Sequence, residues 1–309
     1  MKELFVTKVF GADAQAIIDK ANGILAEYAG QGYTLTLRQL YYQLVSRGYI
    51  ANNIKSYKRI GSIISDGRLA GLIDWDHIED REREVVKPPS WESPGELLEA
   101  AAAQFRIDKW ENQPSYLEVM VEKTALEGIL RPVCRQEQMA FTANKGYSSS
   151  SAMYEAAARL RTQLEAGKEV HVLYLGDHDP SGIDMTRDVR DRLTMFMGNV
   201  DADCYEDDDG KKVIAGFFVD RLALNMAQVE EMRPPENPAK ITDSRAKSYI
   251  AEFGRSSWEL DAIEPRELSQ LVTDFAARYR DNDLWDVEVG REQTMQAAIL
   301  AAKKTLPSI

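Results

Sequence analysis

VHVLYLGDHDPSG, the sequence of residues 170–182, joins an apolar run to a turn that carries two aspartates between glycines. The run at residues 170–175 contains no helix or strand breaker, which predicts a strand buried in a sheet. In parallel α/β sheets, ligands bind beyond the carboxyl ends of the strands. The stretch therefore predicts an α/β domain in which Asp177 and Asp179 lie at the edge of the sheet where ligands bind.

The flanking sequence alternates between strand and helix patterns. Strands are predicted at 116–121 and 139–142, and helices at 124–136, 151–164 and about 183–197. This β-α-β-α-β-α order is typical of a parallel sheet covered by helices. Further strands are predicted at 213–219 and 221–224, with an antiparallel arrangement left open, and the acid-rich residues 201–210 are predicted to form a surface loop.

The N-terminal part has a different pattern. Apolar spacing predicts three short helices, at about 11–30, 36–48 and 55–66. Between Arg38 and Arg68 there are six basic residues and one acid, a net charge of +5. Three helices of which the last is basic are typical of a helix-turn-helix or winged-helix module that contacts DNA. A small helical bundle with a solvated basic face fits the same pattern. The candidate DNA-contacting residues on the third helix are Lys55, Lys58 and Arg59.

Proline and turn-forming residues are concentrated at 85–95, which predicts a domain boundary. We therefore expect a winged-helix-like domain at 1–87, a linker with a helix at 88–114, and an α/β domain with a C-terminal helical extension at 115–309. A chain of 309 residues is long enough for two domains.

Composition narrows the class of protein. Taken alone, the net charge of −12 argues against binding to nucleic acid, although the acids are concentrated outside the basic 38–68 stretch. Cys134 and Cys204 lie far apart, and with only three histidines a zinc or histidine-rich metal site is not expected. No apolar run has the length of a membrane helix or a signal peptide. We expect a reduced, cytoplasmic protein.

Glu122 follows the strand at 116–121 directly, so it should lie at the same edge of the sheet as Asp177 and Asp179. Residues two apart at a strand end point to one side, which lets the two aspartates converge. Carboxylates without nearby Cys or His ligands favour Mg²⁺, with Mn²⁺ as an alternative. Glu122, Asp177 and Asp179 are therefore the predicted metal ligands.

Simpler interpretations fit the same acids. An aspartate after a strand is often the N-cap of the following helix with a surface acid beside it. Glu122 alone is equally compatible with a salt bridge to Lys123 or Arg159.

Three segments together resemble the Toprim domain of the topoisomerase VI A subunit and of the related meiotic double-strand-break protein. They are residues 121–123 (VEK), 144–148 (NKGYS) and 176–182 (GDHDPSG). The resemblance implies that Glu122, Asp177 and Asp179 hold Mg²⁺ and that Lys145 lies near a DNA phosphate.

A second segment, TLRQLYY at 36–42, resembles the family's arginine-x-x-tyrosine-tyrosine stretch on a winged-helix domain. The resemblance implies that Tyr42 attacks the DNA backbone and that Arg38 assists it. Residues four apart share one helix face, which suits this pairing. Tyr41 is the second candidate nucleophile, and both tyrosines are also compatible with simple core packing. A weaker similarity covers residues 257–262.

The resemblance implies Mg²⁺-dependent cleavage of double-stranded DNA through a phosphotyrosyl bond. It also implies a homodimer, in which the tyrosine of one protomer works with the metal of the other, and a possible ATPase partner of the B-subunit type. The size is more like that of the small stand-alone A-like proteins of phages and mobile elements. Two alternatives stay open: a hydrolytic Toprim nuclease, and a catalytically silent DNA-binding regulatory protein.

Overall fold

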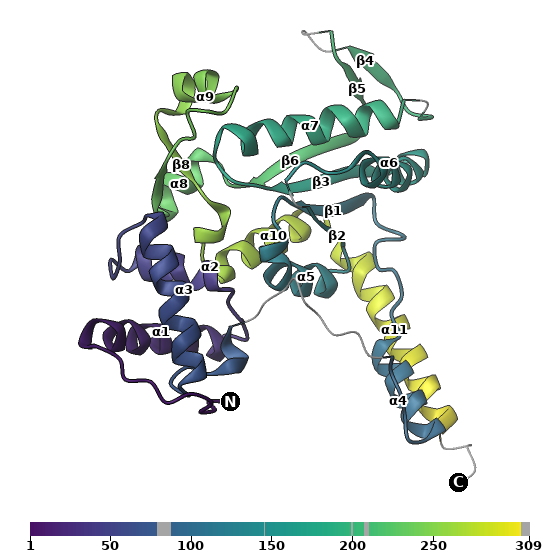
Figure 1. The fold of residues 1–309 in the computed structure, drawn as a ribbon. Coiled ribbons are helices and arrows are strands. Elements are labelled where there is room, and N and C mark those ends of the chain that lie inside the picture. The colour runs from purple at the N-terminus through teal and green to yellow at the C-terminus, as the bar shows by residue number, and fades with distance from the viewer. Residues whose placement is uncertain (79–87, 145, 199, 207–209, 304–309) are drawn as a thin grey trace.

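The computed structural model of the protein describes all residues except 79–87, 145, 199, 207–209 and 304–309. Figure 1 shows a helical N-terminal part, a central sheet covered by helices on both faces, and a helical arm that projects away from the sheet. Among the described residues, no helix is both long enough and apolar enough to cross a membrane.

The central sheet confirms the predicted α/β class. It contains β1 (Ser115–Val121), β2 (Ala140–Ala143), β3 (Glu169–Leu175) and β6 (Phe217–Ala223) in the order β2-β1-β3-β6. All three pairings are parallel, and Val121 pairs with Leu175 at the carboxyl ends of β1 and β3. The residues that follow these two strands are therefore neighbours in space.

The chain after β3 departs from the sequence-based prediction. Strands were expected at 213–219 and 221–224, with an antiparallel option. Residues 213–214 instead belong to a short strand, β5 (Lys212–Ile214), and most of the remaining residues form β6, which runs parallel to β3. The expected acidic loop contains β4 (Cys204–Glu206), which is exposed and pairs antiparallel with β5, whose Ile214 is buried. Residues 207–209 of that expected loop lie outside the described residues.

Helices cover both faces because successive strand residues point to opposite sides. One face of β3 packs Leu173 and Leu175 against α5 (Glu127–Gln136) and α10 (Pro265–Tyr279). The other face packs Val172 and Tyr174 against α6 (Ser150–Glu165) and α7 (Pro180–Phe196). A short 3-10 helix, η2 (Thr124–Leu126), leads from β1 into α5. Burial on both faces explains the nearly continuous apolar pattern of β3.

The N-terminal part contains the three predicted helices, α1 (Ala12–Gly30), α2 (Leu37–Ser46) and α3 (Ile54–Leu69), around a core of their own. Thr36 and Gln39 form a capping box that fixes the start of α2. After α3, residues up to 78 form a 3-10 helix, η1 (Trp75–His77), and isolated β-bridges. Within residues 1–78 no hairpin of the kind that defines a wing is present.

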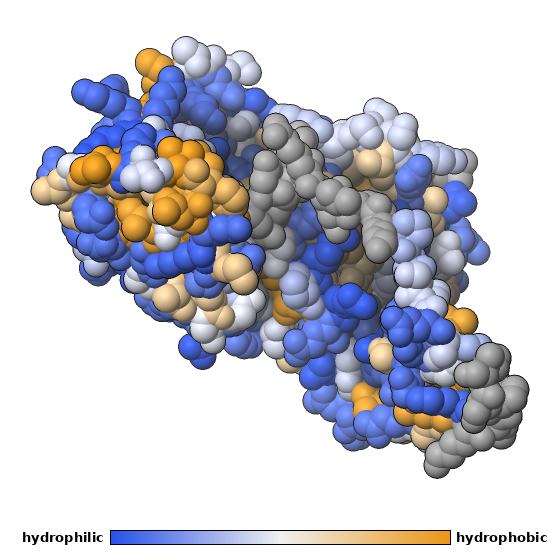
Figure 2. Space-filling model, turned by 60° about the horizontal axis from the view of Figure 1, so that its bottom comes forward, coloured by the Kyte–Doolittle hydropathy of each residue, from blue (hydrophilic) through white to orange (hydrophobic). Residues whose placement is uncertain are grey.

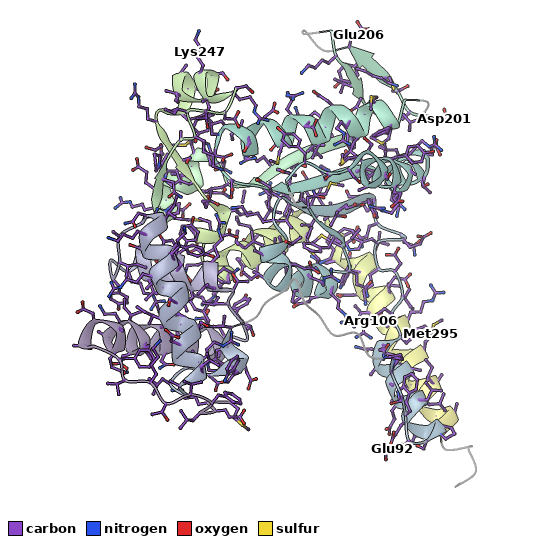
Figure 3. All side chains as sticks on the ribbon, viewed as in Figure 1. Glu92, Arg106, Asp201, Glu206, Lys247 and Met295 are labelled. Atoms are coloured by element: carbon purple, nitrogen blue, oxygen red, sulfur yellow. The ribbon has the colours of Figure 1, made fainter. Side chains whose placement is uncertain are left out.

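An arm is formed by α4 (Pro94–Gln104) packed along α11 (Asn282–Lys303). Lys109 Nζ lies 2.8 Å from Glu292 of α11, where both side chains are nearly buried. Figure 3 shows Arg106 and Met295 on this arm, with Glu92 near its far end. Apolar side chains are exposed on the N-terminal part and on the arm, including Phe5 and Leu300 (Figure 2). The segment 88–114 thus packs against the C-terminal helix in addition to connecting two parts of the chain.

The segment between β6 and α10 connects the sheet with the N-terminal helices. It contains α8 (Met226–Met232), β7 (Glu236–Pro238), α9 (Ala246–Phe253), β8 (Ser256–Trp258) and the 3-10 helix η3 (Leu260–Ala262). β7 and β8 pair antiparallel, Trp258 exchanges backbone hydrogen bonds of 2.9 Å with His178, and η3 packs against α2. This segment therefore places α2 near the carboxyl end of the sheet.

Candidate functional site

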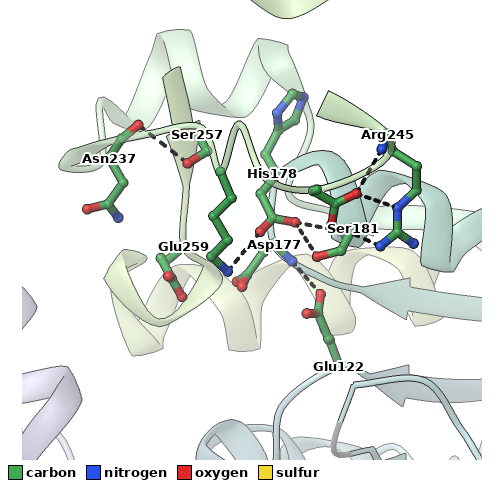
Figure 4. A network of polar contacts seen from close by, with 12 residues as sticks. Glu122, Asp177, His178, Ser181, Asn237, Arg245, Ser257 and Glu259 are labelled. Carbon is green, nitrogen blue, oxygen red and sulfur yellow. Dashed lines mark hydrogen bonds and ion pairs between the residues drawn. The ribbon is translucent and has the colours of Figure 1, made fainter. Parts of the chain in front are cut away.

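The three predicted ligand residues meet at the carboxyl end of the sheet, in what we call the acidic site (Glu122, Asp177 and Asp179). The Asp177 backbone N–H donates to Glu122 Oε2 at 2.9 Å, across the ends of β1 and β3 (Figure 4). The side chain of Asp179 accepts hydrogen bonds from the Gly182 N–H at 2.7 Å and from the Ser181 hydroxyl at 2.9 Å. Asp179 is thus the N-cap of α7, as the simpler interpretation expected, and it also borders the acidic site.

Gly176 and Gly182 let the backbone of the turn at 176–182 lie close to Glu122 and to the Asp177 carbonyl group. A Cβ added at Gly176 would lie 2.8 Å from Glu122 Oε2, and one added at Gly182 would lie 2.1 Å from the Asp177 carbonyl oxygen. The contact at Gly182 is with backbone and is far shorter than a carbon–oxygen contact allows, so the turn requires glycine there for steric reasons. At Gly176 a side chain would force the Glu122 carboxylate or the Tyr174 ring to shift.

Arg221 of β6 holds the same turn from the other side. Its guanidinium donates to the carbonyl oxygens of Gly176 at 3.1 Å, Asp177 at 2.5 Å and Gly182 at 2.9 Å. A guanidinium that satisfies several carbonyl groups at once fixes their relative positions. Arg221 was not singled out from the sequence, although two adjacent charged residues, Asp220 and Arg221, within a strand pattern are an available signal.

Lys123 places a positive charge at the edge of the acidic site. Its ammonium lies 2.7 Å from Asp177 Oδ2 and 3.3 Å from Asp261 Oδ2, and it also contacts Glu259. The other Asp177 oxygen accepts the Leu260 backbone N–H at 2.8 Å. The salt bridges considered for Glu122 are therefore made by its neighbours: Lys123 pairs with Asp177, and Arg159 pairs with Glu118 at 2.7 Å.

Arg38 connects α2 to these residues. Its guanidinium lies 2.7 Å from Glu259 and 2.9 Å from Asp261, a residue that is only 2% exposed. Arg38, Lys123, Asp177, Glu259 and Asp261 form one continuous ion network, which we refer to by that name. The network joins the N-terminal helices to the acidic site within a single chain.

The two tyrosines of α2 have different surroundings. Tyr41 donates its hydroxyl proton toward Asn52 Oδ1 at 3.0 Å or the Asn53 carbonyl at 3.2 Å, and its oxygen accepts the Asn53 N–H at 2.9 Å. Tyr42 is 5% exposed, and its ring lies 5.8 Å from the Arg38 guanidinium carbon. Burial and then Glu259 raise the pKa of Tyr42, whereas Arg38, Asn237 and Lys123 lower it. Tyr42 thus faces the ion network, while Tyr41 is engaged at the start of α3.

Burial and mutual repulsion dominate the electrostatics of the acids. Burial raises the pKa of Glu122, and the Asp179 carboxylate adds to the rise. Burial, with Glu259 and Glu122, raises the pKa of Asp177 to about 8 although Lys123 opposes the change. Against the effect of burial, Lys123 and Arg38 lower the pKa of Glu259 to about 2. The local excess of carboxylates is therefore only partly balanced by the cations nearby.

The donor set of the acidic site suits a hard cation, because carboxylate oxygens are the ligands that Mg²⁺ prefers. In the observed conformation these oxygens are held by backbone N–H groups, by the Ser181 hydroxyl, by Lys123 and by Lys240, whose Nζ lies 3.4 Å from Asp179 Oδ2. Among the described residues, no group of three or more His, Cys, Asp or Glu side chains is arranged to hold a metal ion. The residue types fit Mg²⁺, but binding would require Asp177 to exchange the Lys123 ammonium for the ion.

His178, between the two aspartates, points elsewhere. Its Nδ1 lies 2.8 Å from the Tyr249 hydroxyl, and the side chain is 1% exposed. Burial, followed by the charge of Arg221, lowers the pKa of His178 to about 4. Its imidazole is therefore neutral near pH 7 and packs behind the turn.

The predicted DNA-contacting residues Lys55, Lys58 and Arg59 are exposed on α3, where Arg59 lies 4.0 Å from Asp13. Lys145 lies outside the described residues. The sequence drew attention to Asp261 only through the weak similarity at 257–262 and gave no sign of Asn237; both reach the site from distant parts of the chain. Comparison of the chain with protein-family models, curated proteins and solved structures finds no match.

Proposed function

We propose that the protein is a DNA-cleaving transesterase in which Tyr42 attacks a backbone phosphate of double-stranded DNA. The observation that carries this proposal is the ion network, because it connects Arg38 and Tyr42 of α2 to Asp177 of the acidic site. A purely structural tyrosine would not require Arg38, Lys123 and Glu259 to act on its hydroxyl group. The finer fold assignment that accompanies the proposal is a winged-helix-like domain followed by a Toprim domain.

In the proposed reaction the Tyr42 oxygen forms a bond to phosphorus while the bond from phosphorus to the 3′ oxygen breaks. The phenol loses a proton, and the departing 3′ oxygen gains one. Arg38 and Lys123 favour the charged phenolate, because both lower the pKa of Tyr42. Mg²⁺ held by Glu122, Asp177 and Asp179, with Mn²⁺ as a substitute, would neutralise charge on the phosphate.

Long-range attraction to DNA would come from exposed cations of α3. Lys55, Lys58 and Arg59 are suited to contact phosphates, which give affinity without sequence information. A homodimer would place two acidic sites on opposite strands and give a double-strand break. A separate ATPase of the B-subunit type would be needed only if the protein also passes strands.

The test uses supercoiled plasmid, Mg²⁺ and three proteins: the wild type, Tyr42→Phe and Tyr41→Phe. We expect covalent protein–DNA adducts with the wild type and Tyr41→Phe, and none with Tyr42→Phe. Adducts from Tyr42→Phe but not from Tyr41→Phe would move the nucleophile to Tyr41. Adducts from both variants would refute a role for either tyrosine.

A second candidate function is hydrolytic cleavage of DNA at the same acidic site. The observation in its favour is the raised pKa of Tyr42, since a buried neutral phenol is a weak nucleophile. Free 5′ phosphate ends without adducts would support this function. Binding of DNA that is unchanged in Asp177→Ala, without any cleavage or Mg²⁺ binding by the wild type, would instead support a silent regulatory protein.

A further inference from the structure

We propose that Asn237 donates a hydrogen bond to the Tyr42 oxygen as that oxygen becomes charged, and that Asn52 and Tyr41 orient Asn237 for this task. The inference rests on the proposed function of Tyr42 as the nucleophile. It assigns a reaction role to one residue of β7 and positioning roles to two residues of the N-terminal helices.

The orientation of the Asn237 amide follows from its neighbours. Asn52 Nδ2 donates to Asn237 Oδ1 at 2.8 Å and to the Glu236 carbonyl at 2.9 Å. The Asn52 oxygen in turn accepts the Tyr41 hydroxyl at 3.0 Å. Because the oxygen of Asn237 faces Asn52, its amide nitrogen must point to the opposite side.

That nitrogen is buried and makes no hydrogen bond of normal geometry with any described residue. It nevertheless lies close enough to Tyr42 to lower the pKa of the phenol. In the antiparallel pair of β7 and β8, Asn237 lies opposite Ser257. Ser257 stands two residues before Glu259, whose carboxylate binds Arg38. Asn237 and Arg38 therefore approach the Tyr42 side chain from different elements.

A buried donor without a partner costs free energy, so the fold gains nothing from Nδ2 in the ground state. The donor acquires a strong partner when Tyr42 loses its proton or when the Tyr42 oxygen bonds to phosphorus. An interaction that is made only as charge develops lowers the barrier without tightening the ground state. This behaviour distinguishes a reaction role from a role in packing.

Glu259 makes such a donor necessary. Among the charged groups that influence Tyr42, Glu259 disfavours the phenolate, while Arg38 and Lys123 favour it. Both cations are already engaged by Glu259 and Asp261. The Asn237 amide is uncharged and its nitrogen is free of other partners in the described part of the chain, so it remains available to Tyr42.

The first experiment measures the rate of adduct formation on supercoiled plasmid. Asn237→Ala removes the donor, and we expect the rate to fall roughly 10- to 100-fold, as for loss of a hydrogen bond to a charged group. Asn52→Asp keeps Asn237 but removes the N–H group that donates to Asn237 Oδ1. The Asn237 amide should then turn its nitrogen toward the new carboxylate and away from Tyr42, and the rate should fall similarly. Ser257→Ala is the matched control, because the Ser257 hydroxyl donates to the backbone carbonyl of Asn237, at 3.4 Å, and not to the Asn237 side chain.

The second experiment does not depend on cleavage. In protein labelled with ¹³C at the tyrosine Cζ, the Tyr42 signal is identified by its absence from Tyr42→Phe. We expect the Tyr42 titration midpoint to move to higher pH in Asn237→Ala and in Asn52→Asp, because the phenolate loses a donor, and to stay in place in Ser257→Ala.

The adduct rates and the Tyr42 titrations distinguish failure of the proposed function from failure of the role of Asn237. If the wild type forms no adducts, the proposed function fails, but the Tyr42 signal still decides whether Asn237 acts on the phenol. Adduct rates and Tyr42 titrations that are the same in the wild type, Asn237→Ala and Asn52→Asp would overturn the role of Asn237, whether or not DNA is cut.

Discussion

Replacing Gly182 by alanine tests whether the turn at 176–182 is held by steric contact. Gly182 lies in the first turn of α7, where alanine is normally the better residue. An added Cβ would nevertheless lie 2.1 Å from the carbonyl oxygen of Asp177, 2.9 Å from its carbonyl carbon and 3.2 Å from Glu122 Oε2. Two of these atoms belong to the backbone and cannot rotate away, so the turn itself must move.

The expected magnitude combines two opposing contributions. Alanine in place of glycine inside a helix stabilises a protein by about 0.5–1 kcal/mol. Overpacking a tight site costs typically about 1–3 kcal/mol and occasionally more. Because the clash is with backbone, we expect the upper part of that range and a net loss of roughly 1–3 kcal/mol in the free energy of unfolding. Displacing the carboxylates should also weaken Mg²⁺ binding at least about tenfold.

Urea unfolding and calorimetric titration with Mg²⁺ measure these two effects. Gly23→Ala in α1 is the matched control, because nothing lies within 4 Å of its added Cβ, and it should stabilise the protein by about 0.5–1 kcal/mol. If Gly182→Ala were as stable as Gly23→Ala and bound Mg²⁺ like the wild type, the steric account of the turn would be wrong.

Three further predictions concern charge. Arg38→Met should lower the free energy of unfolding by about 1–3 kcal/mol in urea titrations, because buried Asp261 loses one of its two cations, and Arg38→Lys should recover part of the loss. Since the pKa of His178 is about 4 in the folded protein against 6.5 ordinarily, its stabilising effect is complete above pH 6.5 and is lost as the pH falls toward 4. The free energies of unfolding from urea titrations at pH 7.5 and 5 should therefore differ by about 2 kcal/mol more in the wild type than in His178→Gln. Because the pKa of Asp177 is raised to about 8, Mg²⁺ affinity should increase from pH 6 to 8, and binding should release a proton. Calorimetry in buffers of different ionisation enthalpy measures both effects, and an affinity that does not depend on pH would contradict this prediction.

The sequence predicted those features that depend on local patterns. The three N-terminal helices, the strands β1 to β3 and their parallel order follow from apolar periodicity and capping residues, and all are present. The convergence of Glu122 with Asp177 and Asp179 followed from a general property of parallel sheets, in which strand ends meet at one edge. These expectations needed no knowledge of which distant segments pack together.

Local sequence patterns could not predict contacts between segments that are far apart in the sequence. Arg38 and Glu259 are separated by 221 positions, and nothing near either residue indicates the other. The parallel direction of β6 is decided by how the chain crosses the sheet, and the pairing of α4 with α11 depends on packing between segments that are far apart in the sequence. The adjacent charges of Asp220 and Arg221 within β6 were a visible local sign of a contact of this kind.

The ion network also bears on how a dimer would work. The resemblance implied that the tyrosine of one protomer acts with the acids of the other, yet Tyr42 here faces Glu259 and Lys123 of its own chain. Moving α2 to a partner would take Arg38 from Asp261, which is 2% exposed, and leave that carboxylate with Lys123 alone. As in Arg38→Met, leaving this buried carboxylate with one cation in place of two costs about 1–3 kcal/mol. Unless the partner supplies an equivalent carboxylate pair for Arg38, this cost favours a site completed within one chain, and a dimer would then serve to bring two complete sites to opposite strands.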